Sequence, residues 1–108
     1  MNSMRKLAFN WANIERIPER IVGIYIFWRG PICLYVGQAK EQDLKKRLNQ
    51  HYSDCHNSWL SLWLQSGHKI SFSYEAVTNK ASIDAKERNR IRSLKPLTNI
   101  THNRKKGD

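Results

Sequence analysis

An inward-facing glutamate is the residue of this chain whose placing most directly suggests chemistry. Glu87 lies between Ile83 and Ile91 on the apolar stripe of a predicted helix. A carboxylate in that position is costly unless a cation or a metal ion meets it. Glu87 is therefore either a metal ligand or an acid paired with Arg90 or another basic side chain. Asp84 lies on the solvent-exposed face of the same predicted helix and is expected to be an ordinary surface acid.

A basic pair lies on an earlier predicted helix, where Arg47 and His51 are four residues apart and so share one face. An arginine can hold a phosphate with two hydrogen bonds and stabilise its charge during hydrolysis. A histidine can donate to a phosphate oxygen or move a proton. The same pair also fits a solvated basic helix with a half-buried histidine, and the spacing alone does not decide between the two.

Two tyrosines, Tyr25 and Tyr35, lie in neighbouring β-prone runs and could share one face of a hairpin. Strand tyrosines are usually core residues with one satisfied hydroxyl. A phenol with a pKa of about 10 is a poor base at neutral pH. It becomes a credible base only if a metal-bound water or neighbouring cations lower that pKa.

The elements that must position these residues follow from the spacing of apolar residues. An apolar recurrence at Leu7, Trp11 and Ile14 predicts a short helix that ends at Pro18. β-Branched and aromatic runs predict strands at 21–28 and 32–37, joined by a turn, and alternation predicts a third strand at 69–77. Helical periodicity predicts helices at 42–54, with Asp43 as N-cap, at 58–66, expected to be buried, and from Ser82 to about Leu94.

Composition limits the class of protein and the partners. A chain of 108 residues is expected to form one domain, and its formal net charge of +10 favours a polyanionic partner such as nucleic acid. A membrane partner is disfavoured, because no long basic amphipathic helix and no apolar run of about 20 residues is evident. Two cysteines and the absence of a secretory signal favour a cytoplasmic protein, and Cys55 with the nearby histidines matches no structural zinc pattern.

Five short motifs follow one another along the chain: GIY at 23–25, YVG at 35–37, QAK at 38–40, KKRLNQH at 45–51 and ERNRIRSLKPLTNI at 87–100. In order and spacing they resemble the GIY-YIG nuclease superfamily, and are most similar to the type of the UvrC N-terminal catalytic domain. The resemblance implies an α/β (α+β) fold in which helices flank a small three-stranded antiparallel sheet. It also implies a DNA endonuclease that uses one Mg²⁺ or Mn²⁺ ion.

The resemblance also implies a role for each site residue. Glu87 would be the only protein ligand of the metal, and Tyr35, helped by Tyr25, would activate the attacking water. Arg47 would clamp the phosphate, and His51 would assist it. The residues expected to contact nucleic acid or to brace the site are Gln38, Lys40, Lys46, Lys95 and Asn99. The excision-repair relatives have a lysine where this chain has Gln38, so a phosphate-binding charge is lost.

The expected organisation is a lead-in segment at 1–20, the nuclease domain at 21–100 and a basic tail at 101–108. With so little outside the domain, cutting is expected to be structure-directed or weakly sequence-specific. Double-strand cutting would need a homodimer or a partner chain. Two alternatives remain: a nucleic-acid-binding module without catalysis, and a partner-dependent subunit that docks through the helix at 58–66. Repair, phage and mobile-element settings all fit.

Overall fold

The computed structural model describes residues 5–53, 58–67 and 69–98. They form one antiparallel sheet with the strand order β1-β4-β2-β3. The strands are β1 (Leu7–Ala8), β2 (Gly23–Arg29), β3 (Ile32–Ala39) and β4 (Ser71–Ala76). The predicted hairpin and third strand are confirmed as β2, β3 and β4. The prediction of three strands is wrong by one, because the short β1 pairs with β4.

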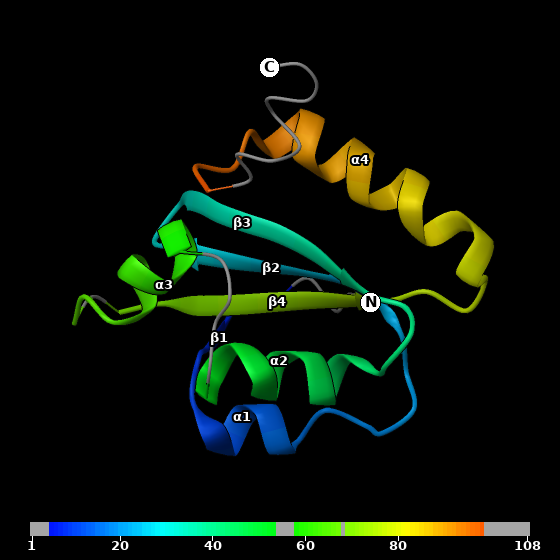
Figure 1. Ribbon diagram of the computed structural model, residues 1–108, viewed down its shortest axis with the longest axis horizontal. Helices are drawn as coiled ribbons and strands as arrows, with labels where there is room; N and C mark the ends of the chain where they lie inside the picture. Colours follow the sequence, from blue (N-terminus) through cyan, green and yellow to red (C-terminus); the bar gives the residue numbers. More distant parts are fainter. Residues whose placement is uncertain (1–4, 54–57, 68, 99–108) are drawn as a thin grey trace.

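Helices cover both faces of the sheet, as Figure 1 shows. On one face lie α1 (Trp11–Glu15) and α2 (Leu44–Ser53), and on the other lies α4 (Ile83–Leu94). A further helix, α3 (Ser58–Leu64), lies at the end of the sheet near the β2–β3 turn. A 3₁₀ turn, η1 (Lys80–Ser82), leads into α4. The α+β architecture expected from the sequence is therefore confirmed, and β3 forms one edge of the sheet.

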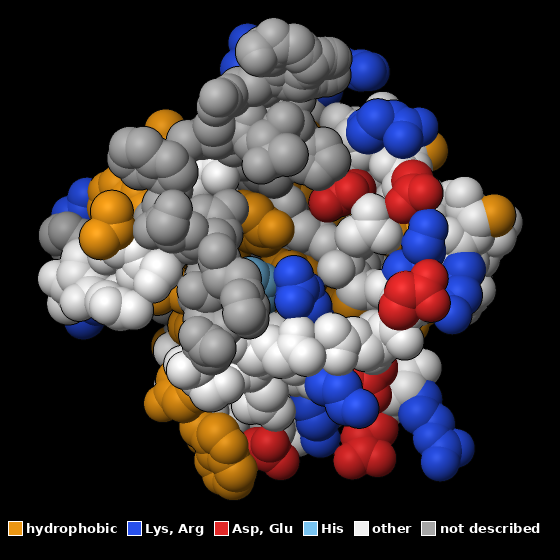
Figure 2. Space-filling model, in the orientation of Figure 1, with side chains coloured by type: hydrophobic (Ala, Val, Ile, Leu, Met, Phe, Trp, Pro, Cys, Tyr) orange, Lys and Arg blue, Asp and Glu red, His pale blue; other side chains and the backbone are white. Residues whose placement is uncertain are grey.

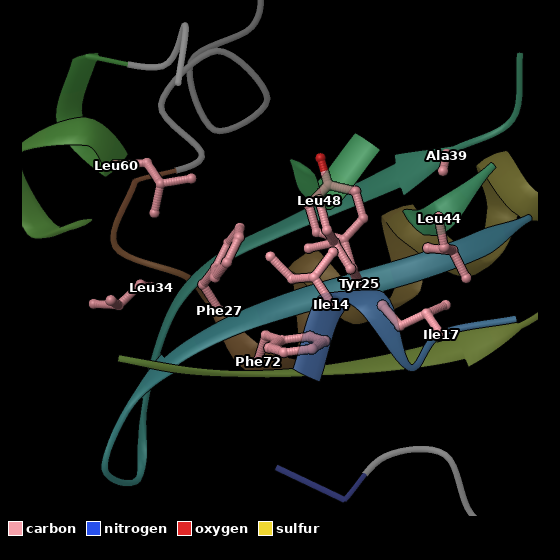
Figure 3. Packing of buried hydrophobic residues seen from close by; sticks show 10 residues of the cluster. All are labelled: Ile14, Ile17, Tyr25, Phe27, Leu34, Ala39, Leu44, Leu48, Leu60 and Phe72. Atoms are coloured by element: carbon pink, nitrogen blue, oxygen red, sulfur yellow. The ribbon is translucent and has the colours of Figure 1, made fainter. Parts of the chain in front are cut away.

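Two hydrophobic clusters hold these layers together. The cluster between the sheet and the α1–α2 layer is drawn in Figure 3 and includes two core aromatics, Tyr25 and Phe27, which point toward Leu48 of α2 and Ile14 of α1. The cluster on the α4 face joins alternate residues of β2, Ile24 and Ile26, to α4. Alternate residues of one strand thus serve opposite layers, as the period of two requires.

The lead-in segment differs from the sequence prediction in one respect. Leu7 lies in β1, and the helix begins only at Trp11, whose side chain is 58% exposed. Asn10 caps α1 by accepting a hydrogen bond from the backbone of Asn13. Ile14 of α1 and Ile17, two residues after the helix ends, are buried in the cluster with α2 and the sheet, so they hold the segment in place. No helix of the described segments is long and apolar enough to cross a bilayer.

One other prediction needs correction, and two details of side-chain hydrogen bonding could not be read from the sequence. The helix at 58–66 is not buried on most sides, because Leu60 is buried but Leu62 is 66% exposed. One exposed leucine is ordinary in a soluble domain and does not by itself mark a docking face. Ser73, on the expected polar face of β4, is fully buried and accepts a hydrogen bond from the indole of Trp28 at 3.0 Å. Ser82 precedes α4 but makes no side-chain cap.

Candidate active site

The glycines of the two motifs are required by close packing. A Cβ at Gly23 would overlap the carbonyl oxygen of Glu75 on β4, and Gly23 also has φ +155°, which side chains rarely adopt. Gly37 lies directly opposite Tyr25 in the β2–β3 ladder. A Cβ at Gly37 would lie 2.5 Å from the phenol oxygen of Tyr25 and 2.7 Å from the ring of Tyr35. The absence of a side chain at Gly37 is therefore what leaves room for the rings of both tyrosines on this face of the hairpin.

Tyr25 is fully buried and hydrogen-bonded to the histidine of α2. Its hydroxyl oxygen lies 2.8 Å from Nε2 of His51, which is itself 5% exposed. Burial raises the pKa of Tyr25 well above its usual value, the neighbouring Tyr35 raises it further, and the Arg47 guanidinium opposes the rise. The phenol therefore keeps its proton at neutral pH and can donate it to an unprotonated Nε2. This geometry fixes the orientation of the His51 ring.

Tyr35 lies on the same face of the hairpin, as predicted, and is less buried than Tyr25. Its ring centroid is 6.1 Å from that of Tyr25 and 5.8 Å from that of His51. Arg47 lies one turn before His51, and its Nη1 donates to Oε1 of Gln50 at 2.9 Å. Its positive charge acts on Tyr25 and opposes the rise in the pKa of that phenol. The structure thus brings four of the five predicted catalytic residues together between β3 and α2.

The fifth, Glu87, lies on α4 and is 7% exposed. Its Oε1 accepts a hydrogen bond of 2.7 Å from Nε2 of Gln38, a residue of β3. Arg90, the partner considered from the sequence, instead binds Glu75 at 2.8 Å. In the described part of the chain, no lysine or arginine forms an ion pair with Glu87. The interpretation of Glu87 as an acid paired with Arg90 is therefore wrong.

Asp84 is not the ordinary surface acid expected from the helical wheel. Its Oδ1 accepts a second hydrogen bond from Gln38 at 2.9 Å, and its Oδ2 lies 3.1 Å from Nζ of Lys40. The Gln38 hydrogen bond, followed by that from Lys40, lowers the pKa of Asp84. Gln38 was expected to contact nucleic acid, but here its amide joins Asp84 to Glu87. Sequence periodicity gave no signal for this network, because 46 positions separate Gln38 from Asp84.

The Glu87 carboxylate suits a divalent cation. Gln38 uses one of the acceptor positions of the carboxylate, which has two oxygens with about four lone-pair sites. No buried side-chain oxygen in the described residues lacks a partner, so the remainder of the Glu87 carboxylate is reached by solvent. The described residues contain no group of three or more His, Cys, Asp and Glu that could hold a metal. An ion bound at Glu87 would keep several waters, as Mg²⁺ commonly does.

The two halves of the candidate site meet at the exposed edge of β3. Gly37 and Gln38 are consecutive, and their side-chain directions alternate between the α2 face and the α4 face. Figure 2 shows this region, in which a histidine and a basic side chain lie side by side between α2 and α4, with acidic side chains on the α4 side.

Two other residues predicted to contact nucleic acid, Lys46 and Lys95, make no contact with the Gln38–Asp84–Glu87 network. Lys46 lines a surface pocket of about 380 Å³ with Glu19, Arg20, Asp43, Lys45 and Asn49. Asp43 caps α2 there, as predicted, by accepting a hydrogen bond from the backbone of Lys46. Lys95 is exposed and ends α4 in a left-handed conformation, with φ 50°. Asn99 lies outside the described residues.

Comparison with known proteins identifies the fold. No family model matches the chain. No curated protein matches it. Among solved structures, it is similar to the GIY-YIG N-terminal endonuclease domain of UvrC from Thermotoga maritima, bound to its catalytic divalent cation, magnesium. The TM-score is 0.65 at 23% identity, over 82% of this chain and 92% of that one.

Two point mutants of the same Thermotoga maritima domain, both bound to the catalytic divalent cation, are also similar. In each, one tyrosine is replaced by phenylalanine. Their TM-scores are 0.65 and 0.63 at 23% and 22% identity, over 82% of this chain and 91% of theirs. The chain therefore has the fold of the GIY-YIG endonuclease domain.

Proposed function

We propose that this chain is a metal-dependent DNA endonuclease that hydrolyses phosphodiester bonds with one divalent cation held by Glu87. The observation that carries the proposal is the buried Glu87 carboxylate, which has no cationic partner among the described residues. From α4, Glu87 is hydrogen-bonded to Gln38 of β3, the edge strand that also carries Tyr35 and pairs with the strand of Tyr25, the partner of His51. The net charge of +10 and the similarity to magnesium-bound endonuclease domains support a polyanionic substrate and a divalent cofactor.

The two tyrosines take different roles in this proposal. Tyr25 is fully buried and keeps its proton, so it orients His51 and does not meet the attacking water. Tyr35 is partly exposed on the same face, so it is the tyrosine that can contact a water molecule at the site. We assign activation of that water to Tyr35.

The remaining residues bind and orient the substrate. Arg47 lies beside Tyr25 and offers the phosphate a planar donor for two hydrogen bonds. His51, held by Tyr25, is placed to donate to a phosphate oxygen or to pass a proton. Gln38 holds the Glu87 carboxylate in place. A bound Mg²⁺ or Mn²⁺ ion would polarise the scissile phosphate and stabilise the negative charge of the leaving oxygen.

With one such site, a single chain would nick one strand, and cutting both strands would need two chains or a partner. We propose weak sequence specificity, because the site residues are suited to contact phosphate, and phosphate contacts carry no sequence information directly. We propose an intracellular role in repair, or in a phage or mobile element, where such an enzyme would meet DNA.

The test is nicking of supercoiled plasmid and cleavage of a branched DNA with Mg²⁺, Mn²⁺ or EDTA. The Glu87→Gln variant keeps the size of the side chain and removes the charge. We expect it to lose at least a hundredfold in rate, in line with losses for key charge-stabilising groups. Glu75→Gln is the matched control. Glu75 lies on β4, away from the site, and it is also a partly buried acid that contacts α4.

Two further outcomes would change the assignment. Unchanged nicking by Glu87→Gln would exclude Glu87 as the metal ligand. Salt-sensitive DNA binding by the wild-type chain, with no cleavage products in either metal, would support a non-catalytic binding module. The hydrogen bond from the Gln38 amide to Glu87 favours this alternative, because it occupies part of the carboxylate.

A further inference from the structure

The basic residues of α4 fall on two flanks that differ in how their charges are neutralised. On the flank facing β4, Lys86 and Arg90 lie four residues apart and both contact Glu75. Arg90 Nη2 is 2.8 Å from Oε1 of Glu75, and Lys86 Nζ is 3.8 Å from its Oε2. This flank is therefore partly neutralised by the protein itself.

The opposite flank faces the edge strand and the candidate active site. Asp84 marks its position, because Gln38 and Lys40 of the β3 edge bind it. Arg88 lies one turn after Asp84 on this flank, Lys95 returns close to the direction of Asp84 three turns on, and Arg92 is rotated about 80° from Asp84 toward solvent. The charge of Arg88 reaches Asp84 and contributes to lowering its pKa.

These flank residues are exposed and make no ion pair with the described part of the chain. Arg88, Arg92 and Lys95 are all exposed, and none is joined to a carboxylate in the segments that the structure describes. Arg88 and Lys95 are seven residues apart, which at about 1.5 Å per residue spans about 10 Å. Measured along the axis of a DNA duplex, where one strand advances about 3.4 Å per nucleotide, that length corresponds to about three nucleotide steps. Figure 2 shows basic side chains over α4 on this face of the molecule.

We propose that Arg88, Arg92 and Lys95 form a phosphate track that holds one DNA strand beside the Glu87 site. The proposal rests on DNA being the substrate and adds the path of the strand along α4. The track binds by charge and reads no base, so it positions DNA of any sequence. The two flanks differ because Glu75 forms ion pairs with Lys86 and Arg90 on the side away from the site.

The test compares two double variants of the full chain. Arg88→Ala/Arg92→Ala removes two charges from the track, and Lys86→Ala/Arg90→Ala removes two from the opposite flank. Both pairs have i, i+4 spacing on the same helix, and both lower the formal net charge from +10 by two, to +8. Affinity for a short fluorescent duplex is measured by anisotropy in EDTA over a range of salt concentrations, and thermal melts confirm that both variants fold.

We expect the track variant to bind at least tenfold more weakly at about 0.1 M salt. Its slope of log affinity against log salt should decrease by about 1.8, since each phosphate contact contributes about 0.9. The opposite-flank variant should lose less than threefold and keep its slope. Equal losses in both variants would show that only net charge matters and would overturn the track, as would no loss in either.

Because EDTA prevents cutting, this result does not depend on Glu87. A wild-type chain that binds through the track but never nicks plasmid would contradict the nuclease proposal alone. Nicking with no difference between the two flank variants would contradict the track alone.

Discussion

Replacing Gly37 by alanine would place a methyl group against both site tyrosines. Its Cβ would lie 2.5 Å from Cζ and the hydroxyl oxygen of Tyr25 and 2.7 Å from Cε2 of Tyr35. Carbon atoms in contact prefer about 3.5–4.0 Å, so the rings must move by about 1 Å. Overpacking of this kind costs about 1–3 kcal/mol. Displacing the phenol also weakens the Tyr25–His51 hydrogen bond, a loss of about 0.5–1.5 kcal/mol. We expect Gly37→Ala to lower the free energy of unfolding by about 2–4 kcal/mol.

Urea unfolding followed by tryptophan fluorescence measures this loss, and Gly30→Ala is the control. Gly30 has φ +58°, and no atom lies within 4 Å of the position that its Cβ would take, so alanine there meets only backbone strain of about 1–2 kcal/mol. Tyr25→Phe removes the clashing hydroxyl but also the hydrogen bond to His51, so it should cost less stability in the Gly37→Ala background than in the wild type. If Gly37→Ala costs no more than Gly30→Ala, or if Tyr25→Phe costs the same in both backgrounds, the packing argument for the motif glycine is refuted.

Two other predictions concern the proposed metal ligand and a buried thiol. Gln38→Ala removes the hydrogen bond that holds Glu87 and should weaken Mg²⁺ binding about 10- to 100-fold, measured by calorimetry. Gln42→Ala, whose amide binds Gln50, should not weaken it, and equal effects would contradict the role given to Gln38. Burial raises the pKa of Cys33 from 9.0 to about 11, so the folded state holds this proton more tightly than the unfolded state. Stability should therefore fall as pH rises from 9 through 11, and between pH 8 and pH 10 the wild type should lose roughly 1 kcal/mol more than Cys33→Ala in parallel urea titrations. An equal loss in both proteins would exclude the thiol as the cause.

The elements that carry the site were predictable because each has a local period. The β-branched run of β2 and the apolar stripe of α2 are each readable within about ten residues, and both elements lie where the sequence predicted them. The inward placing of Glu87 followed from the same periodicity on α4. The strand β1 was not predictable in this way, because Leu7 and Ala8 are too few residues to show alternation. It forms because β4 offers it an unpaired edge.

The partners of the site residues were less predictable than their positions. The helical wheel gave the correct exposed side for Asp84, but Gln38 and Lys40 reach it from 46 and 44 positions away. A local sequence pattern gives no information about contacts between residues so far apart in the sequence. For the same reason, the sequence suggested Arg90 as the partner of Glu87, since both lie on one helix, whereas the fold gives Arg90 to Glu75 on β4.

The position of β3 at the edge of the sheet explains how one short segment can serve both halves of the site. Successive residues of a strand face opposite layers, so Gly37 admits the tyrosines on the α2 face while Gln38 reaches Glu87 on the α4 face. In a central strand these two faces would be separated by the neighbouring strand. At an edge they meet at one rim, where a phosphate lying along β3 can reach groups from both layers. This is why the adjacent substitutions Gly37→Ala and Gln38→Ala are expected to differ in what they disturb. The first should alter the packing of the tyrosines, and the second should alter the affinity for the metal.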